Sequence, residues 1–163
     1  MPASKSFQIR PAILEDVPTI LSLIRDLAEY ERAPNEVVAT EEGLREVFFG
    51  ARPAAEVVLA LEGKMPVGFA VFFHNFSTWL GRAGLYLEDL FVRPDARGKG
   101  YGRALLVHLA RIAQERGCGR MEWAVLDWNE PAIQFYRKLG AAPNDEWTVF
   151  RLTSEGIAKL AQE

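Results

Sequence analysis

Cysteine and histidine are scarce in this sequence of 163 residues, which holds one cysteine and two histidines. The single cysteine, Cys118, excludes an intramolecular disulfide framework and favours a reducing, cytoplasmic location. It follows Gly117 at an expected helix exit, so we expect no covalent nucleophile there. His74 and His108 stand far apart without ligand spacing, and we therefore expect both to be structural or surface residues and infer no metal site.

Long apolar runs and an excess of basic charge are also missing. No run approaches the roughly 20 apolar residues that span a bilayer, and no apolar segment follows residues 1–6 as a secretory signal would require. The formal net charge is −3, whereas a nucleic-acid-binding face needs clustered Lys and Arg. We therefore expect neither a membrane nor a nucleic acid as a partner.

The chain does contain an ordered succession of strand and helix patterns. Alternating apolar residues predict strands, and apolar residues three and four positions apart predict helices. The predicted strands cover residues 7–10, 56–62, 65–76, 84–92, 121–126 and 147–152. The predicted helices cover residues 17–28, 41–49, 100–116, 130–139 and, from a Thr153 cap, 153–160. With no linker or repeat, this order predicts one α/β (α+β) domain over residues 1–163, with a core of about 7–153 around a mixed, mostly antiparallel sheet flanked by helices.

A glycine-rich loop, Arg97–Gly102, lies between a strong strand pattern and a strong helix pattern and reads Arg-Gly-Lys-Gly-Tyr-Gly. A helix N-terminus attracts anions through its unpaired N–H groups and the helix dipole. Glycines allow close backbone approach and positive φ, and Arg97, Lys99 and Arg103 add cations. The alternative is a glycine-rich turn without a ligand, but the combined pattern favours a phosphate-binding loop.

Two common phosphate-binding motifs do not fit this loop. A P-loop needs four residues between its first glycine and Gly-Lys-Ser/Thr, and the sequence does not supply them. In a dinucleotide fingerprint that starts at Gly98 and Gly100, the third glycine position falls on Arg103. The loop also comes late in the chain, after a run of strands. Nucleotide hydrolysis and hydride transfer are therefore both disfavoured.

The same loop matches the signature Arg/Gln-x-x-Gly-x-Gly/Ala, and in this setting the chain resembles the GCN5-related N-acetyltransferase superfamily. The resemblance runs from residues 9–12 through the last predicted strand. Three stretches are similar to the diamine (spermidine/spermine) acetyltransferases and their thialysine-acetylating relatives, namely residues 27–31, 86–92 and 128–136.

The resemblance implies acetyl-CoA as co-substrate, bound where the sheet splays between the strand ending at Val92 and the strand starting near Met121. Backbone groups of Leu90 and Val92 would pair with the pantetheine amides, and the amides of residues 98–103 would hold the pyrophosphate. The full set of cofactor residues would be Leu90, Phe91, Val92, Arg97, Gly98, Lys99, Gly100, Tyr101, Gly102, Arg103 and Asn129. The family is commonly dimeric, so we expect a homodimer.

Acetylation of an amine requires a base, because an alkylammonium with a pKa near ~10.4 is protonated at neutral pH. Glu88 lies in an otherwise apolar strand, where burial raises a carboxylate pKa toward a useful value. The resemblance gives Glu88 the role of a base that acts through water; the alternative is an ion pair with a nearby Arg or Lys. Strand alternation points Asp89 to the opposite face, unless a bulge breaks it.

Tyr136 shares a helix face with Ile133 and Leu139, and this pattern alone predicts a packed core tyrosine. The resemblance instead makes Tyr136 the acid that protonates the departing CoA thiolate. In the absence of a covalent nucleophile, direct attack of the amine on the thioester is preferred.

The acceptor site is expected around Tyr30 and Glu31, which match amine-contacting positions of the diamine acetyltransferases. Glu31 lies near a helix C-terminus, where negative charge opposes the dipole, and the alternative is a solvated helix end. Glu146 and Trp147 offer a carboxylate beside an aromatic surface that suits an ammonium, although the family's glycine before this tryptophan is missing. Trp79 is either another rim residue or a packing residue.

We therefore expect an N-acetyltransferase that acts on a small cationic acceptor, either a polyamine or diamine or a thialysine-like amino acid. Two alternatives stay open: a protein lysine or N-terminal acetyltransferase, and an acyl-CoA-binding module without turnover.

Overall fold

The computed structural model describes residues 6–163. The expectation that no secretory signal starts the chain concerns residues that lie partly outside this range. The chain divides into two compact units, one up to Ala124 and one from Val125 to Glu163, and each is described by itself.

The first unit is built on a five-stranded sheet in the order β1-β2-β3-β4-β5. Its strands are β1 (Phe7–Pro11), β2 (Glu56–Glu62), β3 (Met65–Ser77), β4 (Arg82–Val92) and β5 (Met121–Trp123). Neighbouring strands from β1 to β4 are antiparallel, and β4 and β5 are parallel. The mixed, mostly antiparallel sheet predicted from the sequence is confirmed.

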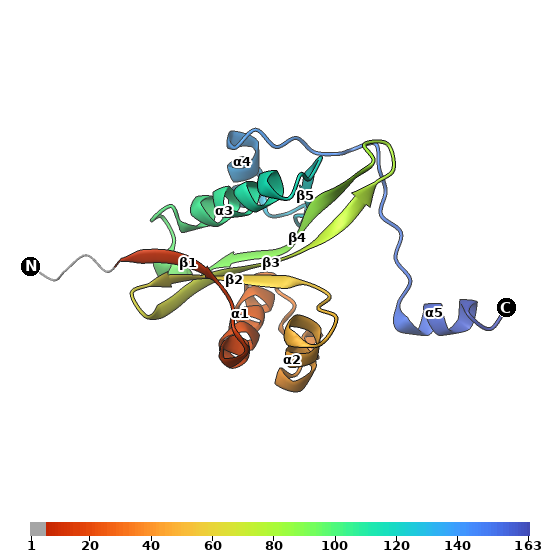
Figure 1. Cartoon of the computed structure of the whole chain (residues 1–163), viewed down its shortest axis with the longest axis horizontal. Coiled ribbons are helices and arrows are strands. Elements are labelled where there is room, and N and C mark those ends of the chain that lie inside the picture. Colours follow the sequence, from red (N-terminus) through yellow and green to blue (C-terminus); the bar gives the residue numbers. More distant parts are fainter. Residues whose placement is uncertain (1–5) are drawn as a thin grey trace, which may run out of the picture. The chain divides into compact units, whose positions relative to one another are not determined.

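Helices cover both faces of this sheet (Figure 1). The helices α1 (Val17–Tyr30) and α2 (Glu41–Phe49) lie on one face, and α3 (Tyr101–Glu115) lies on the other. Residues 57–61 of β2 are all buried, as expected for a strand that is covered from both sides. The core on the α1 side includes Ile20, Leu23, Leu59 and Phe69, all fully buried.

Local signals set the helix ends. The Thr40 hydroxyl accepts a hydrogen bond from the Gly43 N–H at 3.1 Å, which caps α2, and Gly50 follows the last residue of that helix. Pro18 lies in the first turn of α1, where its missing N–H costs no helical bond. Within residues 6–124 the structure also contains three short 3₁₀ helices: η1 (Leu14–Asp16), η2 (Pro34–Glu36) and η3 (Pro94–Ala96).

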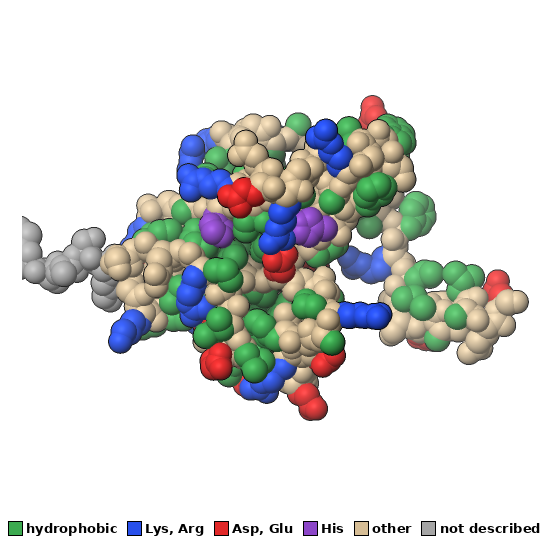
Figure 2. Space-filling view, viewed as in Figure 1, with side chains coloured by type: hydrophobic (Ala, Val, Ile, Leu, Met, Phe, Trp, Pro, Cys, Tyr) green, Lys and Arg blue, Asp and Glu red, His purple; other side chains and the backbone are tan. Residues whose placement is uncertain are grey.

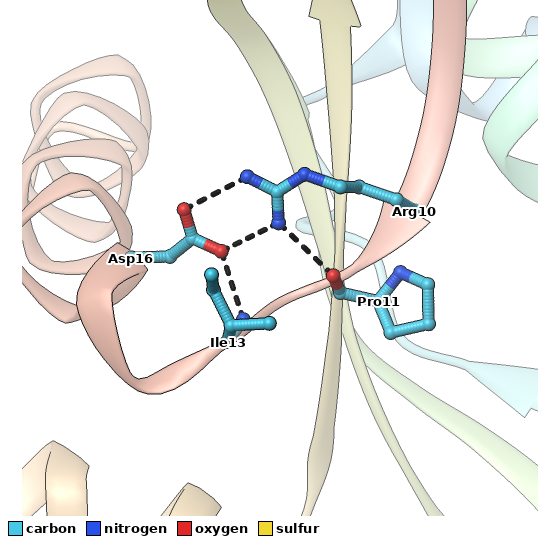
Figure 3. A network of polar contacts seen from close by, with 4 residues as sticks. All are labelled: Arg10, Pro11, Ile13 and Asp16. Carbon is cyan, nitrogen blue, oxygen red and sulfur yellow. Dashed lines mark hydrogen bonds and ion pairs between the residues drawn. The ribbon is translucent and has the colours of Figure 1, made fainter.

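A polar network joins the end of β1 to the start of α1 (Figure 3). The Arg10 guanidinium donates to both oxygens of Asp16 at 2.6 and 3.0 Å and to the Pro11 carbonyl at 3.0 Å. Asp16 also accepts from the Ile13 N–H at 2.8 Å. These hydrogen bonds satisfy the polar groups of the turn that leads from the sheet into the helix.

The second unit contains α4 (Glu130–Lys138) and α5 (Ser154–Leu160). The Thr153 hydroxyl accepts from the Gly156 N–H, as the sequence predicted for this cap. The strand predicted over residues 147–152 is wrong, because these residues form no backbone ladder. Their side-chain alternation is compatible with a strand, but a strand also needs a hydrogen-bonding neighbour. The exposed fractions of Val149 and Phe150 are 87% and 93%.

Other predicted boundaries differ by a few residues. The strand β5 ends at Trp123 rather than Leu126, and β4 begins at Arg82 rather than Gly84. No helix within residues 6–163 is long and apolar enough to cross a membrane. On the face shown in Figure 2, basic side chains lie among acidic and apolar ones, and no broad basic patch forms among the described residues visible there.

Candidate active site

The sheet opens between β4 and β5. The two strands pair only through Leu85 with Met121, Tyr86 with Glu122 and Leu87 with Trp123. β5 then ends, whereas β4 continues to Val92. The predicted splay is therefore present within the first unit, and residues 88–92 present one edge that β5 does not cover.

The register with β3 decides which N–H and C=O groups of β4 point to this open edge. The Arg93 N–H donates to the Val67 carbonyl at 2.8 Å, so residue 93 points its polar groups toward β3. Because successive residues of a strand point to opposite edges, Leu90 and Val92 direct their N–H and C=O groups to the open side. An extended chain carrying amide groups can pair there, as the sequence analysis expected for pantetheine.

A bulge interrupts β4 just where the sheet opens. The β3 residue Val71 pairs with Asp89, and the next β3 residue, Phe72, pairs with Leu87. Glu88 is therefore an extra residue without an opposite partner on β3, which is the definition of a β-bulge. Paired residues of antiparallel strands share a face, and Val71 belongs to the core beside α1. Asp89 consequently points to the α1 face.

The bulge corrects the expectation that Asp89 points away from Glu88. Leu87 pairs with Phe72, whose ring lies under Arg116 at the end of α3. Leu87 therefore faces α3, and alternation turns Glu88 toward α1. Because the extra residue shifts the alternation by one position, Asp89 follows Glu88 onto the same face. Both carboxylates thus lie on the α1 face of the sheet.

Three carboxylates interact on this face: Glu31, Glu88 and Asp89. Burial, the negative charge of Glu88 and the negative charge of Glu31 together raise the pKa of Asp89 to about 6, with burial the largest cause. Burial also raises the pKa of Glu31. Glu88 is exposed. A cation that enters this cluster relieves the repulsion and replaces lost solvation.

The C-terminal end of α1 lies against the end of β4. The ring centroids of Tyr30 and Phe91 are 6.4 Å apart, and Arg93 pairs with Asp26 of α1 at 3.2 Å. The Arg97 guanidinium carbon lies 4.4 Å from the centroid of the Tyr30 ring, within the range of a cation–π contact. The structure therefore brings the predicted acceptor residues Tyr30 and Glu31 together with Glu88 and the start of the glycine loop.

The glycine loop has the backbone that the sequence predicted. Gly98 and Gly100 adopt φ values of +78° and +82°, a region that other residues enter only at a cost. Gly100 is the residue before α3, and its carbonyl accepts from the Ala104 N–H at 3.0 Å. The N–H groups of residues 101–103 lie in the first helical turn, where no intrahelical acceptor exists. They are suited to bind an anion.

The side chains of the loop do not all point to this helix start. Lys99 pairs with both oxygens of Glu62 at 3.0 and 3.1 Å, and this hydrogen bond raises the pKa of Lys99. The Tyr101 ring stacks on Phe7 at 4.2 Å between centroids, with the planes parallel within 1°. Lys99 and Tyr101 thus tie the loop to β1 and β2. Sequence reasoning missed these partners because they come from strands distant in the chain.

The remaining predicted site residues belong to the second unit. Asn129 precedes α4, and its side-chain oxygen accepts from the Ala132 N–H at 3.4 Å, so it caps this helix. Tyr136 lies on α4 beside Phe135, with 5.4 Å between ring centroids. Glu146 and Trp147 lie in an exposed segment without regular structure. Their roles in binding and catalysis stay predictions.

Asp89 is the main site residue that the sequence analysis did not include. The only signal for it is the irregular pattern Leu85, Leu87, Leu90, Phe91 and Val92, in which the apolar alternation slips by one position around Glu88 and Asp89. No group of three or more His, Cys, Asp or Glu within residues 6–163 is arranged to hold a metal ion.

The chain is similar in sequence and in fold to proteins that are already known. The sequence profile of the acetyltransferase (GNAT) family matches residues 22–141. The thialysine N-epsilon-acetyltransferase of Bos taurus is 40% identical, over 94% of this chain and 96% of its own. The L-ornithine N5-acetyltransferase NATA1 of Arabidopsis thaliana is 33% identical, over 94% and 87%. The solved structure of an integron cassette protein from the mobile metagenome of V. cholerae superposes with a TM-score of 0.82 at 29% identity and covers 97% of this chain and 99% of its own.

Proposed function

Since the chain belongs to the acetyltransferase (GNAT) family and is an N-acetyltransferase, we propose that it transfers the acetyl group of acetyl-CoA to a primary amine of a small cationic acceptor. The observation that carries this proposal is the open edge of β4, which leads from the carboxylates of Glu88 and Asp89 to the glycine loop. Acetyl-CoA is the co-substrate that GNAT acetyltransferases use.

The cofactor residues fit the chemical groups of acetyl-CoA. The amides at the start of α3 would hold the pyrophosphate, and the open-edge groups of Leu90 and Val92 would pair with the pantetheine arm. Arg97, Lys99 and Arg103 would add positive charge, and Asn129 would add a further contact. We propose no metal in the reaction, because amine attack on a thioester needs a base and an acid rather than a Lewis acid.

The acceptor residues fit a cation. Tyr30 offers an aromatic face, and the carboxylates of Glu31, Glu88 and Asp89 offer negative charge, with Glu31 and Asp89 partly desolvated. Glu146 and Trp147 would extend this site. The relatives favour an amino acid with a terminal amine, because their names refer to thialysine and L-ornithine; a diamine or polyamine is the second small acceptor.

In the proposed reaction, Glu88 accepts the ammonium proton through a water molecule, and the neutral amine then attacks the thioester carbon. The new C–N bond replaces the C–S bond. The attacking nitrogen gives up its second proton to solvent as the C–S bond breaks, and Tyr136 donates its proton to the thiolate of CoA. Tyr136 then regains a proton from solvent, and Glu88 releases to solvent the proton it accepted. Positioning the amine among the carboxylates contributes by reducing the entropic cost of reaching the transition state.

We also propose that residues 1–163 form one catalytic domain, that the enzyme is a cytoplasmic homodimer, and that neither a nucleic acid nor a membrane is a partner. The family match from residue 22 to residue 141 crosses the division at Ala124 and supports a single domain. Trp79, 88% exposed, lies with Phe76 and Leu80 at the exposed tip of the β3–β4 hairpin and offers an apolar surface to a second copy.

A CoA-release assay with thialysine, L-ornithine, spermidine and a lysine peptide tests the proposal. We expect turnover with at least one small amine and a fall in kcat of about 10²–10⁴ for Glu88→Gln and for Tyr136→Phe. Glu41→Gln, which removes an exposed carboxylate on α2, is the matched control and should leave kcat unchanged. Full turnover of both site variants contradicts the assigned roles. Turnover of the peptide alone indicates a protein acetyltransferase, and CoA binding without turnover indicates a binding module.

A further inference from the structure

The helices α1, α3 and α4 end in the same backbone turn, but α1 does so without glycine. Gly117 after α3 and Gly140 after α4 adopt φ values of +67° and +91°, and the next N–H in each case donates to a carbonyl five residues earlier. After α1 the same position holds Arg32, with a φ of +63° and the same hydrogen bonds. Within residues 6–163, Arg32 is the one residue other than glycine with a positive φ.

This position is costly for an arginine. The left-handed region crowds the Cβ, so glycine is the usual residue there. The helix dipole does not account for the arginine, because a cation in the last helical turn gains the same interaction without strain. The last turn of α4 holds Arg137 and Lys138 and still leaves a glycine after the helix. Costly backbone conformations cluster at functional sites, and Arg32 directly follows the acceptor residues Tyr30 and Glu31.

We propose that Arg32 binds the carboxylate of an amino-acid acceptor, and that it thereby selects an amino acid with a terminal amine over a diamine or a polyamine. This inference rests on the proposed function and names the substrate class of the same site.

The first step of the argument is the order of charges at the end of α1. The negative charge of Glu31 acts on Asp89 and contributes to the raised pKa of that carboxyl. These carboxylates attract the terminal ammonium of an acceptor, but they repel the carboxylate of an amino acid. A diamine has no carboxylate and gains nothing from a nearby cation. An amino acid needs a cation beside the acidic groups, and Arg32 is the residue next to Glu31.

The second step is the separation of the charges. The Cα atoms of Glu31 and Arg32 are about 3.8 Å apart, as in any pair of consecutive residues. Extended glutamate and arginine side chains can hold their charges about 6–8 Å apart, roughly the distance from the terminal nitrogen to the carboxylate in ornithine or thialysine. One acceptor molecule can therefore contact both side chains.

The third step compares Arg32 with other cations near the site. Arg93 pairs with Asp26 at 3.2 Å, and Lys99 pairs with Glu62 at 3.0 Å. The proposed function gives the cations of the glycine loop to the cofactor. The Arg32 side chain is exposed and lies on the acceptor side of the site. Its planar guanidinium can bind a carboxylate through two parallel hydrogen bonds.

Steady-state CoA release from acetyl-CoA, with thialysine or with bis(2-aminoethyl) sulfide, tests the inference, because the second amine differs only in lacking the carboxylate. We expect the wild type to prefer thialysine in kcat/KM. In Arg32→Gln, kcat/KM for thialysine should fall about 10–100-fold, mainly through KM, as expected for the loss of charged hydrogen bonds. The value for the diamine should not fall. Arg32→Lys should restore part of the preference, and the matched control Arg25→Gln, which removes an exposed arginine of α1, should leave it unchanged.

Arg32→Gly separates the side chain from the backbone. Because glycine adopts a positive φ without strain, the Tm of this variant should rise, while the preference for thialysine should be lost as in Arg32→Gln. A higher Tm with an unchanged preference would mark a purely structural residue and overturn the inference. An unchanged ratio of the two kcat/KM values in Arg32→Gln, or a wild type that prefers the diamine, would also overturn it. Absence of CoA release with either amine would instead overturn the proposed function.

Discussion

Asp89 lies opposite Val71 in the β3–β4 ladder, although strand alternation from Leu87 would place it on the other face. The extra residue that causes this shift is Glu88, so one bulge both frees Glu88 from pairing and turns Asp89 into the α1 side. Bulges are frequent beside active sites because they re-aim side chains. Here the bulge assembles two adjacent carboxylates on one face.

Asp89→Asn should make the protein more stable at neutral pH. The pKa of Asp89 is raised from 3.8 to about 6 in the folded state, so the folded protein holds this proton more strongly than the unfolded chain. The contribution of Asp89 to stability is therefore greatest below pH ~4 and is lost as the pH rises through about 6. At about 1.4 kcal/mol per pKa unit, the variant should gain about 2–3 kcal/mol at pH 7.5.

Urea unfolding of the wild type and of Asp89→Asn at pH 4.5 and pH 7.5 measures this difference. The gain at pH 4.5 should be about a third of the gain at pH 7.5, and kcat/KM for the amine should fall in the variant. A variant that is less stable than the wild type at pH 7.5 would contradict the raised pKa.

Gly100→Ala should weaken CoA binding by changing the loop backbone. Gly100 has a φ of +82°, and an added Cβ would meet no atom within 4 Å, so the cost is conformational, about 1–2 kcal/mol. Gly63→Ala is the matched control, because Gly63 has a φ of +64° with equally open surroundings in the β2–β3 turn. Both variants should lose similar stability in thermal unfolding, whereas only Gly100→Ala should raise the Kd for CoA. Equal CoA affinity in the two variants would refute the role of the loop.

Gly68→Ala should disturb the open edge of β4. A Cβ at Gly68 would lie 2.5 Å from the Phe91 carbonyl oxygen, so β3 and β4 must separate there. Overpacking of this kind costs about 1–3 kcal/mol. Gly84→Ala places a Cβ 2.3 Å from the Asn75 side-chain oxygen, at the distal end of the same two strands, and this clash is with a side chain rather than with the backbone. Thermal unfolding measures the loss of stability in each variant, and calorimetry should find weaker CoA binding for Gly68→Ala than for Gly84→Ala; the reverse order would contradict the position of the site.

Glu62→Gln should strengthen CoA binding. Glu62 holds Lys99 at 3.0 Å, and its removal releases the lysine and deletes a negative charge near the expected phosphates. We expect the Kd for CoA to fall about two- to fivefold at low ionic strength, the range typical of exposed charge pairs. The gain should shrink above about 0.1 M salt, where the Debye length is about 10 Å. An unchanged Kd at low salt would show that Lys99 does not reach the phosphates.

Asp16→Asn should destabilise the first unit. The hydrogen bond from Arg10 lowers the pKa of Asp16, so its stabilising contribution is present above the ordinary pKa of 3.8 and is lost as the pH falls through the lower folded value. The variant loses a charge-assisted pair and weakens the bond from the Ile13 N–H, at a cost of about 1–2 kcal/mol at pH 7. The difference in the free energy of unfolding between the wild type and the variant should be smaller at pH 3 than at pH 7. An equal difference at both pH values would argue against an electrostatic origin.

The elements with strong local signals were predictable to the residue. The helix over residues 41–49 has Thr40 before it and Gly50 after it, and the strand over residues 56–62 ends at the Gly63 turn. The glycine loop was recognisable for the same reason, since its chemistry lies in consecutive residues.

What the sequence did not reveal depends on pairing between distant segments. The bulge at Glu88 is defined by β3, and the partners of Lys99 and Tyr101 come from β2 and β1. The alternation of residues 147–152 describes side chains only, and the absence of a ladder there depends on which neighbour is present. Interactions of this kind are properties of the folded chain rather than of a local pattern.

The open edge of β4 divides the amide protons of a single strand into two kinds. The N–H of Phe91 points to β3 and is protected inside the ladder, whereas the N–H groups of Leu90 and Val92 point to the open side. Hydrogen–deuterium exchange should therefore alternate between slow and fast from one residue to the next along this strand. Occupation of the edge by a second extended chain should abolish the alternation and leave three consecutive slow amides.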